Sequence, residues 1–313
     1  MDNLIARFAD NIFWLGRYME RAENVARILD INETYARENE EGPDWQRVLV
    51  LYADTDAFLA RYAVIDAASV VAFYINDRDN PSSIVSVIFQ ARENARSVRH
   101  LISTEMWTHL NISHNRMLEL TPRALQLGNL SRLCSEIKES CQTFEGIAEG
   151  TFLRGERWCF YQMGKYIERA DQTTRILDMG FARAGEDLGA AMEAVHWNVL
   201  LRSVAGYHAY RSRHPAGSRP RDIAIFLLYD REFPRAVGLC VERLSTRLIE
   251  LETLHGHRRH DSVEAARRAL VFALDTGPGG QITQQRLHKF LDELQILLGG
   301  VSSAIATTYF SGR

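Results

Sequence analysis

A group of arginines shares one face of a helical segment near the N-terminus with a glutamate. At about 100° per residue, five polar residues fall within one sector of about 120°. They are Arg17, Glu20, Arg21, Asn24 and Arg27. The planar guanidinium group binds carboxylates and phosphates through paired hydrogen bonds. A glutamate among arginines can orient them or act as a general base, so the spacing fits anion recognition or acid–base chemistry.

This polar stripe occurs a second time, 148 residues further along the chain. Residues 16–30 and 164–178 share nine identities in fifteen positions. The second copy carries Lys165, Glu168, Arg169, Gln172 and Arg175. One repeat over about half of the chain indicates two related halves rather than a solenoid of short units.

A weaker pair of motifs follows in the same order, with residues 81–98 matching 220–237 at six of eighteen positions. The first copy places Arg92, Arg96 and Arg99 on one helix face. The later copy retains Arg231 and Arg235. These positions and the two stripes form the candidate set for binding an anion or a partner.

The stripes have two interpretations that the residues leave open. They can be partly buried ion-pair networks that hold long helices together, since Glu23 and Arg27 also have intrahelical spacing. Alternatively, Arg17, Arg21 and Arg27 outnumber Glu20 in the stripe, and burying an unpaired ion costs several kcal/mol. A surplus of arginines bordered by apolar residues would then recruit an external carboxylate or phosphate. No catalytic residue can be assigned.

Apolar residues recur at three- and four-residue spacing almost everywhere, which predicts an all-α fold. We expect a single bundle of about ten helices, built from two halves related by a pseudo-twofold axis. The expected spans are 5–38, 44–61, 67–74, 82–102, 123–150, 157–183, 187–213, 222–254, 262–274 and 283–309.

Prolines mark several of the expected helix boundaries. Pro43, Pro81, Pro122 and Pro220 stand where helices should begin, because the first turn does not need the missing N–H. Pro234 lies inside an apolar stretch and should kink or divide that helix. No low-complexity linker separates 1–150 from 151–313, so we expect one domain over 1–313 with an internal repeat.

Composition limits the class of protein. The net charge of −3 and the absence of a clear basic recognition helix argue against nucleic-acid binding. No apolar run reaches the roughly 18 residues of a membrane-spanning helix. Four cysteines in 313 residues do not suggest a disulfide framework, and we expect a cytoplasmic protein. Composition does not indicate an oligomeric state.

Other clusters support packing and loops more than chemistry. His255, His257 and His260 are close in sequence, but arginines separate two of them and no cysteine completes a metal set. The cysteines form no CxxC pair. The glycine-rich segment 276–280 lacks the Lys-Ser/Thr of a phosphate-binding loop. We therefore expect no metal and no cofactor.

Four segments carry a resemblance to a known family, and they are GRYMERAENVARILD, ARENARSVRHLISTEMW, GKYIERADQTTRILD and YDREFPRAV. They resemble the motifs of the bacterial alpha-E family, all-helical proteins named for a recurrent Glu-Arg pair. The resemblance extends over essentially the whole chain, down to Tyr309 and Phe310. No established catalytic residues come with it.

The resemblance implies partners and a setting. It implies association with a circularly permuted ATP-grasp ligase, and with a transglutaminase-like or proteasome-like peptidase of the same system. The resulting hypothesis is a non-catalytic accessory protein that binds a substrate or partner in amide or peptide-bond formation and peptide modification. The alternative is an enzyme of that pathway that uses the Glu-Arg motif for acid–base chemistry.

Overall fold

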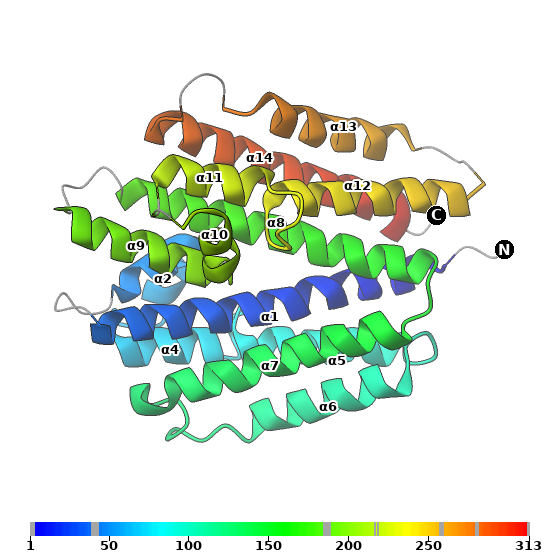
Figure 1. Ribbon diagram of the computed structural model, residues 1–313. Helices are drawn as coiled ribbons and strands as arrows, with labels where there is room; N and C mark the ends of the chain where they lie inside the picture. Colours follow the sequence, from blue (N-terminus) through cyan, green and yellow to red (C-terminus); the bar gives the residue numbers. More distant parts are fainter. Residues whose placement is uncertain are drawn as a thin grey trace. The chain divides into compact units, whose positions relative to one another are not determined.

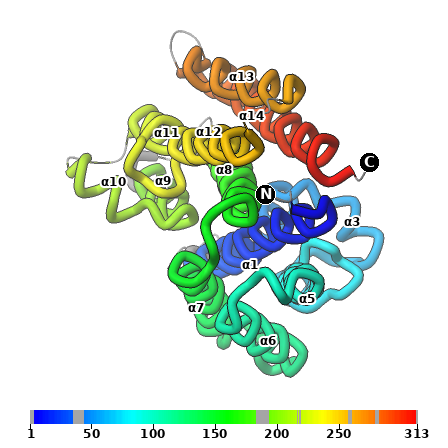
Figure 2. The backbone as a smooth tube through the Cα atoms, turned by 90° about the vertical axis from the view of Figure 1, so that its right-hand side faces the viewer, coloured from blue at the N-terminus to red at the C-terminus, as the bar shows by residue number. Residues whose placement is uncertain are grey.

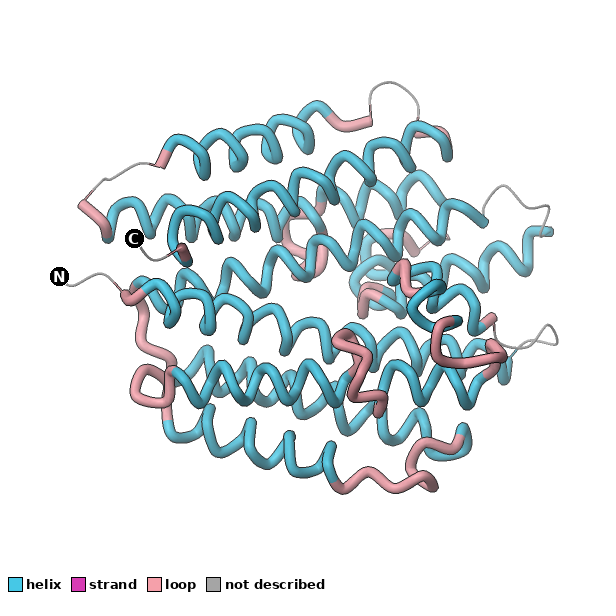
Figure 3. The backbone as a smooth tube through the Cα atoms, turned by 180° about the vertical axis from the view of Figure 1, so that it is seen from behind, coloured by secondary structure: helices cyan, strands magenta, loops and turns pink. Residues whose placement is uncertain are grey.

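The computed structural model describes residues 4–38, 44–183, 189–215, 217, 219–256, 260–278 and 282–311. All regular structure in these residues is helical, as Figure 3 shows, so the predicted all-α class is confirmed. The chain divides into two compact units. We call Asn11–Tyr161 the N-terminal unit, and Met1–Asp10 together with Gln162–Arg313 the C-terminal unit.

Seven helices lie wholly or mainly in the N-terminal unit, and Figure 1 shows their course. They are α1 (Ala6–Glu38), α2 (Trp45–Tyr52), α3 (Thr55–Leu59), α4 (Ala67–Ile75), α5 (Ile84–Ser97), α6 (Thr104–Leu118) and α7 (Leu127–Thr151). Seven more lead through the C-terminal unit. They are α8 (Glu156–Arg183), α9 (Gly189–Ser203), α10 (Tyr207–Arg213), α11 (Pro220–Tyr229), α12 (Val237–Leu254), α13 (Asp261–Thr276) and α14 (Gln284–Ile305), and α14 continues into a π-helical turn over Ala306–Phe310.

The described residues thus contain fourteen α-helices, more than the expected ten. Three expected helices are each divided in two. Ala53 and Ala205 adopt left-handed backbone angles, with φ of 56° and 55°, and so end α2 and α9. Asp230 and Pro234 separate α11 from α12.

One further helix, α6, was not predicted from the sequence. Its buried face includes Ser113 and His114 beside Met106, Leu110 and Met117, so the apolar spacing is interrupted. Its start has a clear physical cause, because the Ser103 hydroxyl accepts a hydrogen bond from the backbone N–H of Met106.

Pro220 and Pro234 behave as expected, whereas Pro81 lies in a turn ahead of α5, whose N-cap is Ser83. Pro220 is the first residue of α11, and Pro234 lies in the break that divides the predicted helix over 222–254. Pro122 stands in a turn, and α7 begins only at Leu127. Pro43 lies outside the described residues.

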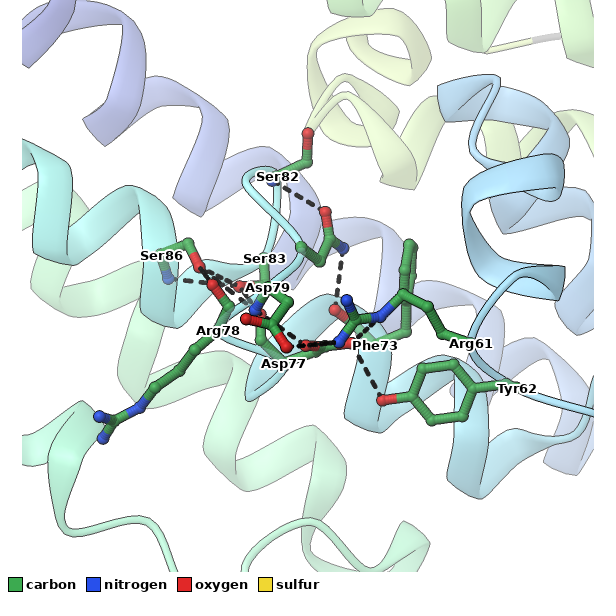
Figure 4. A network of polar contacts seen from close by, with 10 residues as sticks. Arg61, Tyr62, Phe73, Asp77, Arg78, Asp79, Ser82, Ser83 and Ser86 are labelled. Atoms are coloured by element: carbon green, nitrogen blue, oxygen red, sulfur yellow. Dashed lines mark hydrogen bonds and ion pairs between the residues drawn. The ribbon is translucent and has the colours of Figure 1, made fainter.

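A polar network fixes the start of α5 (Figure 4). The Arg61 guanidinium donates to both carboxylate oxygens of Asp77 at 3.0 and 2.6 Å, and the Tyr62 hydroxyl donates to the same carboxylate at 3.2 Å. The Ser83 hydroxyl donates to the Asp77 carbonyl at 2.6 Å and caps α5 by accepting from Ser86 N–H. Burial, and then Asp77, raises the pKa of Tyr62. The network holds the loop before α5, which bears Arg92 and Arg96 and is followed by Arg99.

Antiparallel neighbours dominate the packing in each unit. The tube in Figure 2 shows α5 beside α6, and α13 beside α14. The helices α7 and α14 bury seven positions each at one constant offset of 157 residues. In α7 they are Leu130, Leu133, Cys134, Ile137, Cys141, Phe144 and Ala148, and in α14 they are Leu287, Phe290, Leu291, Leu294, Leu298, Val301 and Ile305. The two helices therefore present matching faces to their units.

Candidate functional site

The first polar stripe lies on α1 with its glutamate inside the protein. Glu20 and Asn24 retain only 4% and 2% of their exposure, and Asn24 Nδ2 donates to Glu20 Oε1 at 3.3 Å. Arg17 and Arg21 are half-buried, and the Arg17 guanidinium stacks on the Trp14 ring at 4.8 Å. The stripe is therefore a partly buried surface, and its carboxylate lies deeper than its arginines.

Glu23 completes this stripe, although its helical angle had placed it outside. Its carboxylate forms an ion pair with Arg27 one turn later and accepts a hydrogen bond from Gln142 Nε2 of α7 at 3.2 Å. The surplus of cations counted from the sequence is thus smaller, because Arg27 has its own carboxylate. The i, i+4 spacing of Glu23 and Arg27 was the signal for this pair.

The second stripe repeats the burial pattern on α8. Lys165, Glu168 and Gln172 are buried, with Glu168 at 1% exposure, whereas Arg169 and Arg175 are half-buried. Arg175 Nε pairs with Asp171 Oδ2 at 2.8 Å, which mirrors the Arg27–Glu23 pair of α1. In both copies, the glutamate of the Glu-Arg pair faces inward, and an acidic residue three positions later forms an ion pair with the last arginine of the stripe.

The second stripe contacts the break between α11 and α12. Thr173 Oγ1 donates to the Arg235 carbonyl at 2.9 Å, and Arg169 Nη1 lies 3.5 Å from the Pro234 carbonyl. The side chain of Arg235 is buried at 8% exposure. In the C-terminal unit the two repeated motifs therefore meet.

Arg231 and Arg235 do not share a helix face, which corrects the expected helix over 222–254. They lie in the non-helical segment 230–236. Arg231 Nη1 donates to the Gly238 carbonyl at 2.8 Å and pairs with Glu242 at 3.3 Å. Asp230 stabilises the turn, since its Oδ1 accepts from the N–H groups of Glu232 and Phe233 at 2.8 and 2.7 Å.

Arg92 and Arg96 of the first motif lie on the continuous helix α5, whereas Arg99, which was expected on the same helix face, lies in the turn after Ser97 because the helix ends there. Arg92 and Arg99 both lie near an aromatic ring. The guanidinium carbons of Arg92 and Arg99 lie 5.5 and 5.6 Å from the ring centroid of Trp107 on α6. Glu93 pairs with Arg92 at 2.7 Å and with Arg96 at 2.5 Å. We call Arg92, Arg96, Arg99 and Trp107 the α5 arginine surface.

Arg99 and Arg96 are the most available cations of this surface. The side chain of Arg96 is 66% exposed. Arg99 is half-buried and has no carboxylate within ion-pair distance in the part of the chain that the structure describes. Trp107 was missed as a site residue because nothing in its own sequence spacing links it to α5.

The repeated motifs end in two aspartates with different partners. Asp30 accepts from Ser131 Oγ at 2.6 Å and pairs with Lys138 Nζ at 2.5 Å, both on α7. Asp178 accepts from His288 Nδ1 of α14 at 2.8 Å. The 157-residue offset that matches α7 to α14 also matches Ser131 to His288.

A second carboxylate stands beside that histidine. Asp292 Oδ2 lies 3.5 Å from His288 Nε2, so the imidazole bridges two aspartates. Ligand atoms of Asp178, His288 and Asp292 lie within 4.8 Å of one another. The hydrogen bond and charge of Asp178 raise the pKa of His288. Sequence reasoning missed this trio because Asp178 and His288 are 110 positions apart.

The remaining sequence candidates have structural surroundings. The rings of His255 and His260 contact Tyr309 at 6.0 and 5.2 Å, and His257 lies outside the described residues. The four cysteines are buried, and burial raises the pKa of the Cys134 and Cys141 thiols. A protonated, buried thiol suits packing rather than nucleophilic attack.

Among the described helices, none has the combined length and apolarity needed to cross a bilayer.

The structure adds two clusters of exposed or half-buried polar side chains to the repeated stripes. They are the Asp178 trio and the α5 arginine surface.

The chain is similar to uncharacterized proteins of Mycobacterium bovis and of two Mycobacterium tuberculosis strains. Each is 26% identical over 274 residues, which is 81% of this chain and 30% of the relative. The chain thus spans about a third of the length of the curated relatives that it matches. No solved structure matches it. A family model described as a predicted alpha-helical domain with a conserved ER motif matches residues 4–310, and the chain belongs to this Alpha-E family.

Proposed function

We propose that the protein is a non-catalytic, partner-binding component of an ATP-grasp-dependent system that forms amide or peptide bonds. The α5 arginine surface is its recognition surface for carboxylate or phosphate groups. The partner is a circularly permuted ATP-grasp ligase, and a transglutaminase-like or proteasome-like peptidase belongs to the same system. The protein acts in the cytoplasm and needs no cofactor.

One observation carries this proposal: two arginines flank an aromatic ring, and one of them lacks a carboxylate among the described residues. The Trp107 ring holds the guanidinium planes of Arg92 and Arg99 by cation–π contact, which limits the rotamer entropy that binding would cost. Arginine in such a frame suits a planar carboxylate or a phosphate.

The relation between the two halves supports a single binding surface. We infer a duplication whose halves are related by a pseudo-twofold axis, and in which the second copy does not form an arginine surface like that of α5. Arg92 and Arg96 correspond to Arg231 and Arg235, and the latter pair contacts Glu242, Gly238 or the protein interior. Arg99 corresponds to Gly238, so no third arginine follows in the second copy.

The proposal is tested by a search of the gene neighbourhood for a circularly permuted ATP-grasp ligase and by copurification of the protein with that ligase. The double variant Arg96→Gln/Arg99→Gln should weaken the complex about tenfold, because each charge-assisted hydrogen bond is worth roughly 1.5–3 kcal/mol before solvent screening. The matched control is Arg123→Gln, an exposed arginine of the same unit with no ion pair in the described residues. If no complex forms and ligase activity does not change, the proposal is wrong.

The enzyme alternative assigns acid–base chemistry to Glu20 or Glu168. Their exposures of 4% and 1% favour a role inside the protein, where each carboxylate holds its neighbours. Folded Glu20→Gln and Glu168→Gln variants decide between the two. Loss of turnover in a reconstituted system supports an enzyme, and a lower melting temperature alone supports the structural role.

A further inference from the structure

A pocket of about 530 Å³ with both apolar and polar walls opens between α5, α6 and α7 of the N-terminal unit. Its apolar part is formed by Ile88, Met117, Leu120, Leu133, Ile137 and Cys141. This volume falls within the range of about 300–1,000 Å³ that small-molecule sites occupy. None of its lining residues belongs to the stripes or to the α5 arginine surface.

Two serine hydroxyls supply polar groups within these walls. Ser113 Oγ donates to the His109 carbonyl at 2.9 Å, so its proton is already used. Ser140 Oγ lies 2.6 Å from Ser113 Oγ and 3.2 Å from His109 Nε2. Each hydroxyl oxygen has two lone pairs, and these contacts occupy at most one on Ser113, so the pair still offers an acceptor to an N–H group of a ligand.

Charges of both signs stand among the lining residues. Arg116 and Glu119 at the end of α6 are exposed, and neither has an ion-pair partner within the residues that the structure describes. Glu136 of α7 is paired with Arg132 at 2.6 Å. An unpaired cation and an unpaired anion beside an aliphatic pocket complement a ligand that carries both charges and an apolar side chain.

The matching face of α14 shows which residues leave this space open. At the 157-residue offset, Ser140 and Cys141 of α7 correspond to Leu297 and Leu298, and Leu133 corresponds to Phe290. The α7 face is thus smaller and more polar at the positions that line the pocket. A pocket that combines aliphatic side chains with small polar and charged ones is typical of a ligand site rather than of a packed core.

We propose that this pocket binds a zwitterionic aliphatic amino acid or short peptide. Arg116 binds the terminal carboxylate, Glu119 binds the ammonium group, and the serine hydroxyls accept N–H groups of the ligand. The aliphatic walls take up the side chain. This site is distinct from the α5 arginine surface and does not depend on the function proposed above.

The test is calorimetric titration of the full chain with leucyl-leucine, N-acetyl-leucyl-leucine and leucyl-leucine amide. The zwitterion should bind in the millimolar range or tighter, and each blocked form should bind about fivefold more weakly, as expected for solvent-exposed ion pairs. Arg116→Gln should abolish the preference over the amide. Glu119→Gln should abolish the preference over the acetylated peptide.

A variant with a larger side chain inside the pocket provides the second test. Ser140→Leu introduces the residue that α14 carries at the matching position and should eliminate binding. If that variant unfolds, Leu133→Phe serves the same purpose. Arg243→Gln, at an exposed arginine of α12 with no ion pair among the described residues, should bind as the unaltered chain does. Equal affinity for all three ligands, or for a folded filled variant, would overturn the proposal.

Discussion

Asp30 and Asp178 end the same repeated motif, yet the first meets a permanent cation and the second a titratable one. Lys138 and Ser131 satisfy Asp30, whereas His288 satisfies Asp178. Ser131 and His288 occupy matching positions on α7 and α14, so the two junctions differ in side chains at equivalent backbone positions. The aspartate accepts a hydrogen bond from the neighbouring helix at both junctions, whereas the charge of the donating side chain differs.

The second pair of motifs differs in backbone rather than in partner. Ala91 and Ala95 of α5 correspond to Asp230 and Pro234, which separate α11 from α12. The alanines keep α5 continuous, so Arg92 and Arg96 project from one helix. The matching segment of the second copy is non-helical; there Arg235 is buried, and the exposed Arg231 donates to the Gly238 carbonyl and pairs with Glu242.

The largest effect should come from moving the helix break into α5. Ala95→Pro removes a backbone hydrogen bond and introduces a steric clash with the preceding turn, which costs about 3 kcal/mol or more. We expect the free energy of unfolding in urea to fall by that amount and binding at the α5 arginine surface to weaken. Ala95→Gly is the control, at about 1 kcal/mol. Equal losses for the two variants would show that the continuity of α5 at residue 95 is unimportant.

A smaller loss should follow from removing the permanent cation of the N-terminal junction. Lys138→Met leaves the Asp30 carboxylate, 11% exposed, with Ser131 as its remaining hydrogen-bond donor among the described residues. We expect about 2 kcal/mol lower stability in urea unfolding, because a partly buried carboxylate loses its counter-ion. Asp30→Asn in the same background should recover part of the loss.

The comparison also predicts the order of the two junctions. His288→Gln should cost well under 1 kcal/mol, since the His288 side chain is 56% exposed and the pair is screened by water. If Lys138→Met costs less than His288→Gln, the two aspartates do not differ as their burial indicates.

Much of the fold could be predicted from apolar spacing, because long helices repeat the signal many times. α1, α8 and α14 were located to within a residue or two at their starts. The left-handed backbone at Ala53 and Ala205 could not be foreseen, since alanine ordinarily favours helix continuation. The helix α6 was missed because the polar residues Ser113 and His114 occupy two of its buried positions and interrupt the apolar spacing.

The candidate site was predictable only where its contacts are local. The Glu23–Arg27 and Asp171–Arg175 pairs follow from i, i+4 spacing. The placement of Trp107 against Arg92 and Arg99 depends on how α6 packs on α5. The partnership of Asp178 with His288 likewise depends on helix packing, and no periodicity within either helix encodes it.

The smallest predicted effect is a pH dependence confined to the C-terminal junction. Asp178 raises the pKa of His288 above its unfolded value of about 6.5. The folded state therefore binds this proton more tightly, and the stabilisation is complete below about pH 6.5 and is lost as pH rises through the folded pKa. Urea midpoints of the unaltered chain and of His288→Gln should differ at pH 5.5 and converge at pH 8.5.

The junction at Asp30 supplies the internal control for this titration. A lysine side chain has no ordinary titration between pH 5.5 and 8.5, so the difference between Lys138→Met and the unaltered chain should be nearly constant over that range. All other titratable groups are common to both members of each comparison and cancel from it. A constant difference for His288→Gln as well would mean that Asp178 requires a hydrogen-bond donor and not a cation, and the two junctions would then be equivalent.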